Sequence, residues 1–142
     1  MNGNPHLLVL CTGNSCRSQM AEGYLRHLAG DRFNVHSGGT QPQEEVHPFA
    51  VQVMAEDDID ISSQRPKFVQ ELLNQLSVKY LIVVCGGANE SCRLIQTDVR
   101  HRLFWPFDDP AAFQGSERET LDEFRRIRDE IKERTQTWLK KV

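Results

Sequence analysis

No stretch of this 142-residue sequence is apolar over a length that could span a membrane, and its N-terminus lacks a signal-peptide pattern. It has no internal repeat, linker or low-complexity tract. With a net charge of −3 there is no general attraction to nucleic acid or anionic lipid, so any anion site must be local. The length suits one domain over residues 1–142. We therefore expect a cytoplasmic monomer that binds neither membranes nor nucleic acid.

Cysteine is scarce, with four residues at Cys11, Cys16, Cys85 and Cys92. In a chain without a signal peptide they indicate a reducing compartment, where thiols are catalytic, metal-binding or inert. A zinc site built from all four is an alternative, but the short paired spacings of such sites are missing. The five histidines show no ligand spacing either. We therefore predict no metal site and interpret the histidines as surface or core residues.

The most informative segment is residues 11–18, with the sequence Cys-Thr-Gly-Asn-Ser-Cys-Arg-Ser. It comes after an apolar run, residues 7–10, that predicts a buried strand, and it precedes a helical pattern of apolar residues. The predicted buried face of that helix holds Met20, Ala21, Tyr24, Leu25, Leu28 and Ala29. A loop that enters a helix N-terminus gathers backbone N–H groups around an anion. The segment therefore predicts a site for a tetrahedral oxyanion.

Each residue type in this loop has a chemical reason to be there. Arg17 can bind the oxyanion with two parallel hydrogen bonds, and the same positive field favours the thiolate of Cys11. Gly13 and Asn14 readily adopt the positive φ that a tight anion nest needs. Ser18 is placed to cap the helix and to donate a hydrogen bond to the Cys11 sulfur. The alternative, a buried strand-end cysteine without chemistry, leaves these residues unexplained.

The loop residues themselves are predicted to bind the substrate anion. They are Thr12, Gly13, Asn14, Ser15, Cys16 and Arg17. No reaction step is assigned to Cys16, which we interpret as structural.

The rest of the chain alternates predicted strands and helices. Further strands are expected at residues 33–36, 80–84 and 101–105. Helices are expected to begin at Pro48, at Pro66 and after Ser116. Ser116 and Glu119 form a capping-box pattern at the start of the last helix. Their predicted buried faces hold Ala50, Val51, Met54 and Ala55; then Val69, Leu72, Leu73 and Leu76; then Leu121, Phe124, Ile127, Ile131, Thr135 and Trp138. This alternation predicts an α/β fold with a parallel sheet and helices on both faces.

Active sites in such sheets lie at the carboxyl ends of the strands. Cys11, Ser37, Cys85 and the segment after Trp105 all fall at such ends. This convergence supports the predicted site independently of the loop sequence.

The pattern Cys-x5-Arg-Ser at the first strand–helix turn, with an Asp-Pro after the last strand, resembles the low-molecular-weight protein tyrosine phosphatases. Within that superfamily the chain is most similar to the thioredoxin-coupled arsenate reductases. The similarity rests on residues 11–22 and 59–62, on Cys85 and Cys92, and on residues 107–110. It implies a single-domain, four-stranded parallel sheet and an arsenical-resistance enzyme that reduces arsenate to arsenite.

The resemblance also implies a role for three cysteines and one aspartate. Cys11 attacks arsenate, Cys85 then attacks the sulfur of Cys11, and Cys92 attacks Cys85. Thioredoxin reduces the resulting disulfide, with glutaredoxin or a small thiol as alternative donors, and no tightly bound cofactor is expected. Asp109 matches the family's general acid, and its neighbour Asp108 is assigned to capping or solvent.

Two other functions remain open from the sequence. A low-molecular-weight tyrosine phosphatase would need only Cys11, Arg17 and Asp109, with water hydrolysing a phosphocysteine, and a reductase could keep residual phosphatase activity. A non-catalytic thiol module would bind arsenite or a metal through its cysteines. The Cys85 and Cys92 pair favours the reductase.

One departure from the family pattern concerns a cation site. Some relatives bind potassium near the loop through Asn, Glu, Ser and Asp; Asn14, Glu22 and Ser37 match the first three, but Lys67 stands at the Asp position. We interpret this as a vestigial site in which the Lys67 ammonium replaces the ion and ties down Asn14 and Glu22. A Lys67 that points to solvent is the alternative.

Overall fold

The computed structural model describes residues 2–85 and 99–142, and four strands of this part form one parallel sheet in the order β2-β1-β3-β4. The strands are β1 (His6–Cys11), β2 (Asn34–Gly39), β3 (Val78–Cys85) and β4 (His101–Phe107). The helices are α1 (Arg17–Ala29), α2 (Pro48–Ala55), α3 (Val69–Gln75) and α4 (Glu117–Leu139), with a short 3-10 turn, η2 (Pro110–Ala112). None of the helices in the described ranges has the length and apolarity needed to cross a membrane.

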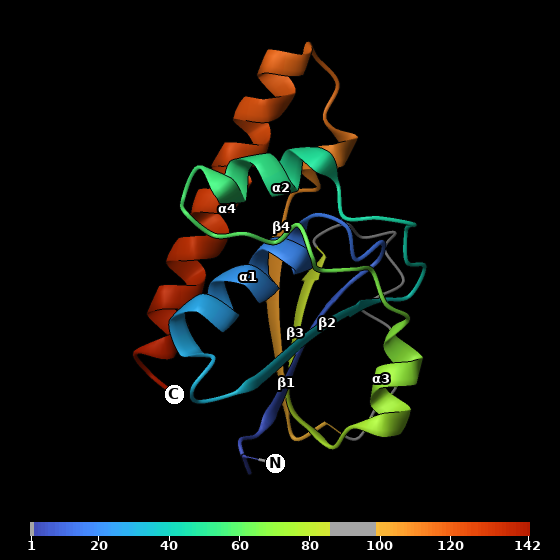
Figure 1. The fold of residues 1–142 in the computed structure, drawn as a ribbon, viewed down its shortest axis with the longest axis vertical. Helices are drawn as coiled ribbons and strands as arrows, with labels where there is room; N and C mark the ends of the chain where they lie inside the picture. Colours follow the sequence, from blue (N-terminus) through green and yellow to red (C-terminus); the bar gives the residue numbers. More distant parts are fainter. Residues whose placement is uncertain (1, 86–98) are drawn as a thin grey trace.

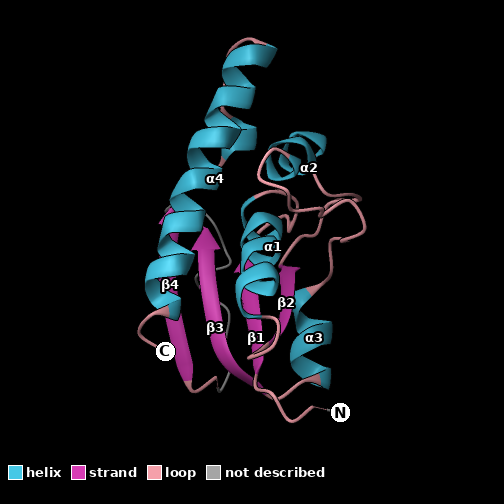
Figure 2. Cartoon of the chain, turned by 60° about the vertical axis from the view of Figure 1, so that its left-hand side comes forward, coloured by secondary structure: helices cyan, strands magenta, loops and turns pink. Residues whose placement is uncertain are grey.

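The helices lie on both faces of the sheet. α1 and α4 pack together on one face, α2 contacts α4 beyond the strand ends, and α3 packs beside β2 on the other face (Figures 1 and 2). The predicted four-stranded parallel α/β fold is confirmed.

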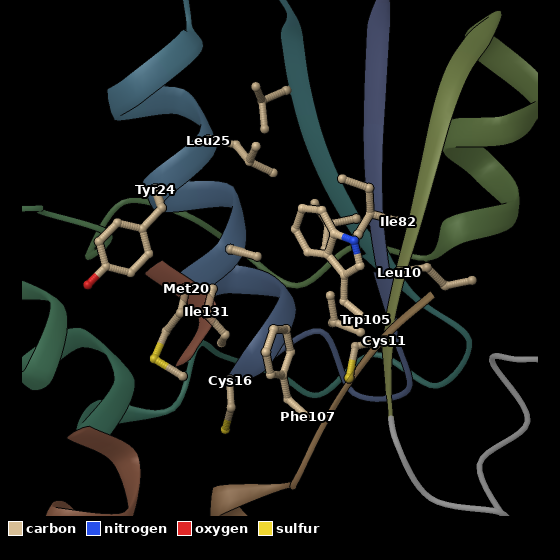
Figure 3. Close-up of a cluster of buried hydrophobic side chains, with 14 of the residues drawn as sticks. Leu10, Cys11, Cys16, Met20, Tyr24, Leu25, Ile82, Trp105, Phe107 and Ile131 are labelled. Atoms are coloured by element: carbon tan, nitrogen blue, oxygen red, sulfur yellow. The ribbon is translucent and has the colours of Figure 1, made fainter. Parts of the chain in front are cut away.

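The two central strands hold the core because both of their faces are covered. Residues 7–10 of β1 and 81–85 of β3 are buried without interruption, as their continuous apolar sequences predict. Against them α1 packs Met20 and Leu25, and α4 packs Ile131 (Figure 3). The start of α4 also agrees with the sequence, since Ser116 and Glu119 form the predicted capping box.

Three details of the predicted helices are wrong. Leu28 is exposed although it lies on the apolar side of α1, because periodicity gives the direction of a side chain and not whether a neighbour covers it there. On α2 the buried face includes Val53 in place of Ala55. Pro66 does not open α3, which begins at Val69; the intervening Lys67 binds Gly39 N–H through its carbonyl and so stays extended beside β2.

A histidine pair crosses from β1 to β2. His6 Nδ1 and His36 Nε2 lie 3.0 Å apart, and both rings are half-buried. Burial, followed by the charges of His6 and Arg26, lowers the pKa of His36 to about 4. The neutral ring is therefore the form that the fold accommodates.

This pair predicts a loss of stability in mild acid. Because His36 titrates near pH 6.5 when unfolded, the unfolded chain takes up its proton first, and stability present above about pH 6.5 falls progressively towards pH 4. The substitution His36→Gln should flatten this slope in urea unfolding between pH 7.5 and 4.5. The exposed His27→Gln serves as the matched control and should keep the slope; equal slopes in wild type and His36→Gln would contradict the assignment.

Candidate active site

The described structure places a cavity of about 1060 Å³ at the carboxyl ends of the strands. One wall is the loop between β1 and α1, residues 12–16, with Cys11 at its start and Arg17 at its end. The segment between β2 and α2, which adjoins the loop, and η2 supply the other lining residues. The remaining lining residues are Gln41, Gln43, Glu44, Glu45, His47, Pro48, Asp109, Ala111 and Ala112.

Main-chain contacts from the segment after β2 hold the loop in place. The N–H groups of Thr40, Gln41, Gln43 and His47 donate to the carbonyls of Cys11, Thr12, Gly13 and Ser15, at 3.3, 2.9, 2.9 and 2.9 Å. In a trans peptide the C=O and the following N–H point in opposite directions, and no peptide bond in the described chain is cis. Because the segment after β2 holds these carbonyls, the N–H group that follows each of them in its peptide points away from that segment.

Asn14 has a left-handed backbone conformation within this loop. Its φ is +50°, as the sequence predicted, and its side chain is fully buried. The side-chain amide donates to the hydroxyls of Ser18 at 2.8 Å and Ser37 at 2.9 Å. Gly13 does not share the positive φ, so that expectation is wrong; its missing Cβ instead lets Gln43 approach, since a Cβ there would lie 3.1 Å from Gln43 Cγ.

The expected role of Ser18 as helix cap is also wrong. The N-cap of α1 is Cys16, which makes no side-chain capping bond, and Ser18 lies within the first turn. Asn14 therefore takes the Ser18 hydroxyl oxygen as an acceptor. The hydrogen bond from Ser18 to the Cys11 sulfur stays a prediction.

Arg17 joins the loop to the end of β4. Its guanidinium is buried, Nη1 donates to the Phe107 carbonyl at 3.0 Å, and Nη2 lies 3.9 Å from Asp109 Oδ2. Asp109 is partly exposed at the cavity edge and caps η2 by accepting from the Ala111 N–H. Asp108 instead pairs with Arg126 on α4 at 3.1 Å. Of the two neighbouring carboxylates, only Asp109 lines the cavity.

Cys11 and Cys16 carry thiols and are both nearly buried at one end of the core cluster (Figure 3). Burial raises the pKa of the Cys16 thiol to about 12, with smaller contributions from Asp109 and Cys11 in the same direction, although a hydrogen bond with Ser15 opposes them. Cys16 is therefore a neutral thiol near neutral pH, which agrees with its interpretation as structural.

Cys85 ends β3, the strand next to β1. The register pairs Leu10 with Val83, so Cys85 lies one residue further along its strand than Cys11 does on β1. Its side chain is fully buried and its sulfur is disulfide-bonded. Cys92, the third predicted cysteine of the relay, lies outside the described residues.

The four residues of the predicted cation site do lie together. The buried Glu22 accepts from the Ser37 hydroxyl, pairs with Arg26 Nη2 at 2.8 Å and lies 3.8 Å from the Lys67 ammonium. Asn14 Oδ1 accepts from the main-chain N–H of Lys67 at 2.8 Å, not from its ammonium. Residues 2–85 and 99–142 contain no cluster of three or more His, Cys, Asp or Glu side chains that could hold a metal.

Sequence reasoning missed the segment of residues 40–47. It adjoins the loop, lines part of the cavity and holds four carbonyls, those of Cys11, Thr12, Gly13 and Ser15. These contacts use main-chain N–H groups, which every residue except proline has, so no residue type signals them. Only the proximity of β1 and β2 brings the segment to the loop.

The high pKa of Cys16 predicts selective alkylation of the reduced protein. With a pKa of about 12, about one Cys16 thiol in 10,000 is ionised at pH 8. Iodoacetamide should therefore modify Cys11 at least about 100-fold faster than Cys16, as measured by fragment-ion mass spectrometry of the tryptic peptide 1–17, which contains both cysteines. Unfolded protein is the control and should lose the difference; equal rates in the folded protein would contradict the assignment.

Comparison with known proteins adds to this geometry. Residues 6–142 match the family described as low molecular weight phosphotyrosine protein phosphatase. The chain is 43% identical over 133 residues to an arsenate reductase of Halalkalibacterium halodurans, covering 93% of each, and 42% identical over 129 residues to an arsenate reductase of Bacillus subtilis, covering 90% of each.

Two solved structures are similar in fold as well. An arsenate reductase in the phosphate-binding state superposes with a TM-score of 0.79 at 29% identity, over 97% of this chain and 98% of the other. A thioredoxin-dependent arsenate reductase of Corynebacterium glutamicum gives a TM-score of 0.64 at 26% identity, over 94% of this chain and 63% of that one.

Proposed function

Because this chain belongs to the low molecular weight phosphotyrosine protein phosphatase family, we propose that its cavity binds a tetrahedral oxyanion and that the protein reduces arsenate to arsenite. The observation that carries the proposal is the grouping of Cys11, Arg17 and Asp109 around one cavity, in a chain 43% identical to an arsenate reductase. The inward N–H groups of residues 12–17 and the Arg17 guanidinium bind the anion.

The first chemical step is nucleophilic attack. The Cys11 thiolate attacks arsenic and forms an S–As bond, and one arsenate oxygen leaves as water after it accepts protons. Asp109, at the cavity edge and 3.9 Å from Arg17, is placed to donate a proton to that oxygen. Arsenic stays in the +5 state in this step.

The second step transfers two electrons. A thiolate of Cys85 attacks the Cys11 sulfur, an S–S bond forms, and the electron pair of the S–As bond stays on arsenic, which leaves as arsenite. Cys92 then attacks Cys85 and releases the Cys11 thiolate. The thiols of thioredoxin reduce the Cys85–Cys92 disulfide and become oxidised themselves. The neighbouring strand-end positions of Cys11 and Cys85 support this order.

The outer wall of the cavity favours a small oxyanion over a phosphotyrosyl peptide. Among the described residues that line it there is no Phe, Tyr or Trp against which a phenyl ring could stack. Hydrolysis of small phosphate esters remains as a residual activity, because Cys11, Arg17 and Asp109 suffice for it.

We also propose that the protein acts as a cytoplasmic monomer with an external thiol reductant and no tightly bound cofactor. A thioredoxin-dependent structural neighbour supports the reductant.

The three-cysteine relay predicts a separation of two activities. Arsenate-dependent NADPH oxidation, with thioredoxin and its reductase supplied, should fall at least about 1,000-fold in Cys11→Ser, which lacks the nucleophile. In Cys92→Ser multiple turnover should fall at least about 100-fold, while hydrolysis of p-nitrophenyl phosphate stays near wild type because that reaction needs no second thiol. Full arsenate turnover by Cys92→Ser would refute the relay, and phosphatase activity without arsenate reduction in wild type would favour the phosphatase.

Lys67 is proposed to replace a bound cation beside the loop. Its ammonium lies 3.8 Å from Glu22, and burial lowers the pKa of Lys67 while the Glu22 carboxylate opposes that shift. Arg26 forms an ion pair with the same carboxylate. The main-chain N–H of Lys67 holds Asn14 in addition, so one residue ties both predicted cation ligands together.

This replacement predicts that the wild-type protein does not respond to potassium. The melting temperature and arsenate KM should be equal in KCl and NaCl at the same ionic strength, whereas Lys67→Asp should gain potassium-dependent stabilisation of a few degrees. Lys67→Met is the matched control and should lose stability without gaining a response. Potassium-dependent stability or activity of the wild type would rule out the replacement.

A further inference from the structure

We propose that Gln19, in the first turn of α1, is a positioning residue that holds the Asn14–Ser15 peptide so that the Ser15 N–H faces the bound oxyanion. The inference deepens the proposed function and rests on it in taking the cavity as the oxyanion site. Gln19 is fully buried and does not line the cavity, so it acts through the loop and not on the substrate.

The donors that hold the loop carbonyls are of two kinds. The carbonyls of Cys11, Thr12, Gly13 and Ser15 accept from main-chain N–H groups of the segment after β2, and that of Cys16 accepts from Met20 N–H within α1. The Asn14 carbonyl instead accepts from the side-chain amide of Gln19, at 2.9 Å. Among these six consecutive carbonyls, the orientation of this one therefore depends on the identity of a side chain.

The side-chain amide of Gln19 cannot easily turn over. Its Nε2 also donates to the Arg65 carbonyl at 3.0 Å, and its Oε1 accepts from Gln64 Nε2 at 2.8 Å. A flipped amide would set oxygen against two carbonyl oxygens and NH₂ against a donor. The buried site thus fixes Gln19 as a donor toward Asn14.

The side-chain contacts of Asn14 do not involve the peptide that links it to Ser15. The Asn14 side chain is held by Ser18, Ser37 and the main chain of Lys67, but none of these contacts reaches the Asn14 carbonyl or the Ser15 N–H. A plane turned over would present the Asn14 carbonyl to the oxyanion and remove the Ser15 N–H. The Gln19 hydrogen bond selects the orientation that binds an anion.

Two substitutions separate this role from simple packing. Gln19→Met keeps the length and apolar bulk of the side chain but removes the donor. Gln19→Glu keeps the acceptor for Gln64 but, when ionised, cannot donate to Asn14. The matched control is Gln64→Met, which removes two hydrogen bonds to Gln19, one to its carbonyl and one to its side-chain oxygen, and leaves the Gln19 donor to Asn14 in place.

The test measures binding of inorganic phosphate by the reduced protein, which requires the loop but no electron transfer. We expect Gln19→Met and ionised Gln19→Glu to raise the phosphate Kd roughly 10- to 100-fold, below the loss typical of deleting an oxyanion donor outright. Gln64→Met should stay within about threefold of wild type. In ¹⁵N spectra phosphate should shift the Ser15 amide of wild type and Gln64→Met, but not that of Gln19→Met.

A Gln19→Met protein that binds phosphate within about threefold of wild type, with its Ser15 amide still shifted, would overturn the proposal. So would a parallel loss of affinity in Gln64→Met. If Gln19→Met does not fold, Gln19→Glu decides in the same way, and its affinity should recover in acid, where the neutral carboxyl can donate. A wild type that binds phosphate through the Ser15 amide but does not reduce arsenate would leave this positioning role intact and refute the proposed function alone.

Discussion

A main-chain oxyanion site works only if successive peptide planes are turned the same way, with N–H groups inward and carbonyls outward. In the loop of residues 12–16 each carbonyl has a donor within the protein: main-chain N–H groups of the segment after β2 and of α1, and the side chain of Gln19. A buried carbonyl without a donor costs about 1–3 kcal/mol, so the surroundings of the loop decide its shape. The central position of β1 brings those surroundings together.

The same constraint explains the charges around the site. Arg17 is buried because it serves both the anion cavity and the end of β4, where it binds the Phe107 carbonyl. That bond fixes the chain two residues before Asp109 and leaves the carboxylate of Asp109 at the cavity edge. Asp108 instead forms an ion pair with Arg126 on α4, so the two adjacent aspartates have different partners. Beneath the loop, Glu22 lies between two cations, Arg26 and Lys67, so the buried carboxylate is compensated by side chains of the protein itself.

The chemistry that the proposed function requires is divided along the chain. In the proposed function residues 11–17 bind a tetrahedral oxyanion and place the Cys11 sulfur against it, but arsenate and phosphate have the same shape and nearly the same charge. Discrimination therefore depends on the fate of the first S–As or S–P bond. A second sulfur at the end of the adjacent strand, Cys85, offers an electron-transfer route that a phosphate ester cannot use.

The sequence by itself determined the strands, the parallel sheet and the loop that lines the cavity, because these depend on local periodicity and on residue types with few physical uses. It predicted the positive φ of Asn14 correctly, but it wrongly assigned a positive φ to Gly13 and a capping role to Ser18. The reason is that a residue type shows which conformations and hydrogen bonds are possible, not which of them the fold uses. The tertiary structure decided which carbonyls of the loop are held and by what, which aspartate lines the cavity, and that Gln19 binds Asn14. These contacts join segments that are distant in the sequence or use main-chain groups common to nearly all residues, so only the folded arrangement of the chain specifies them.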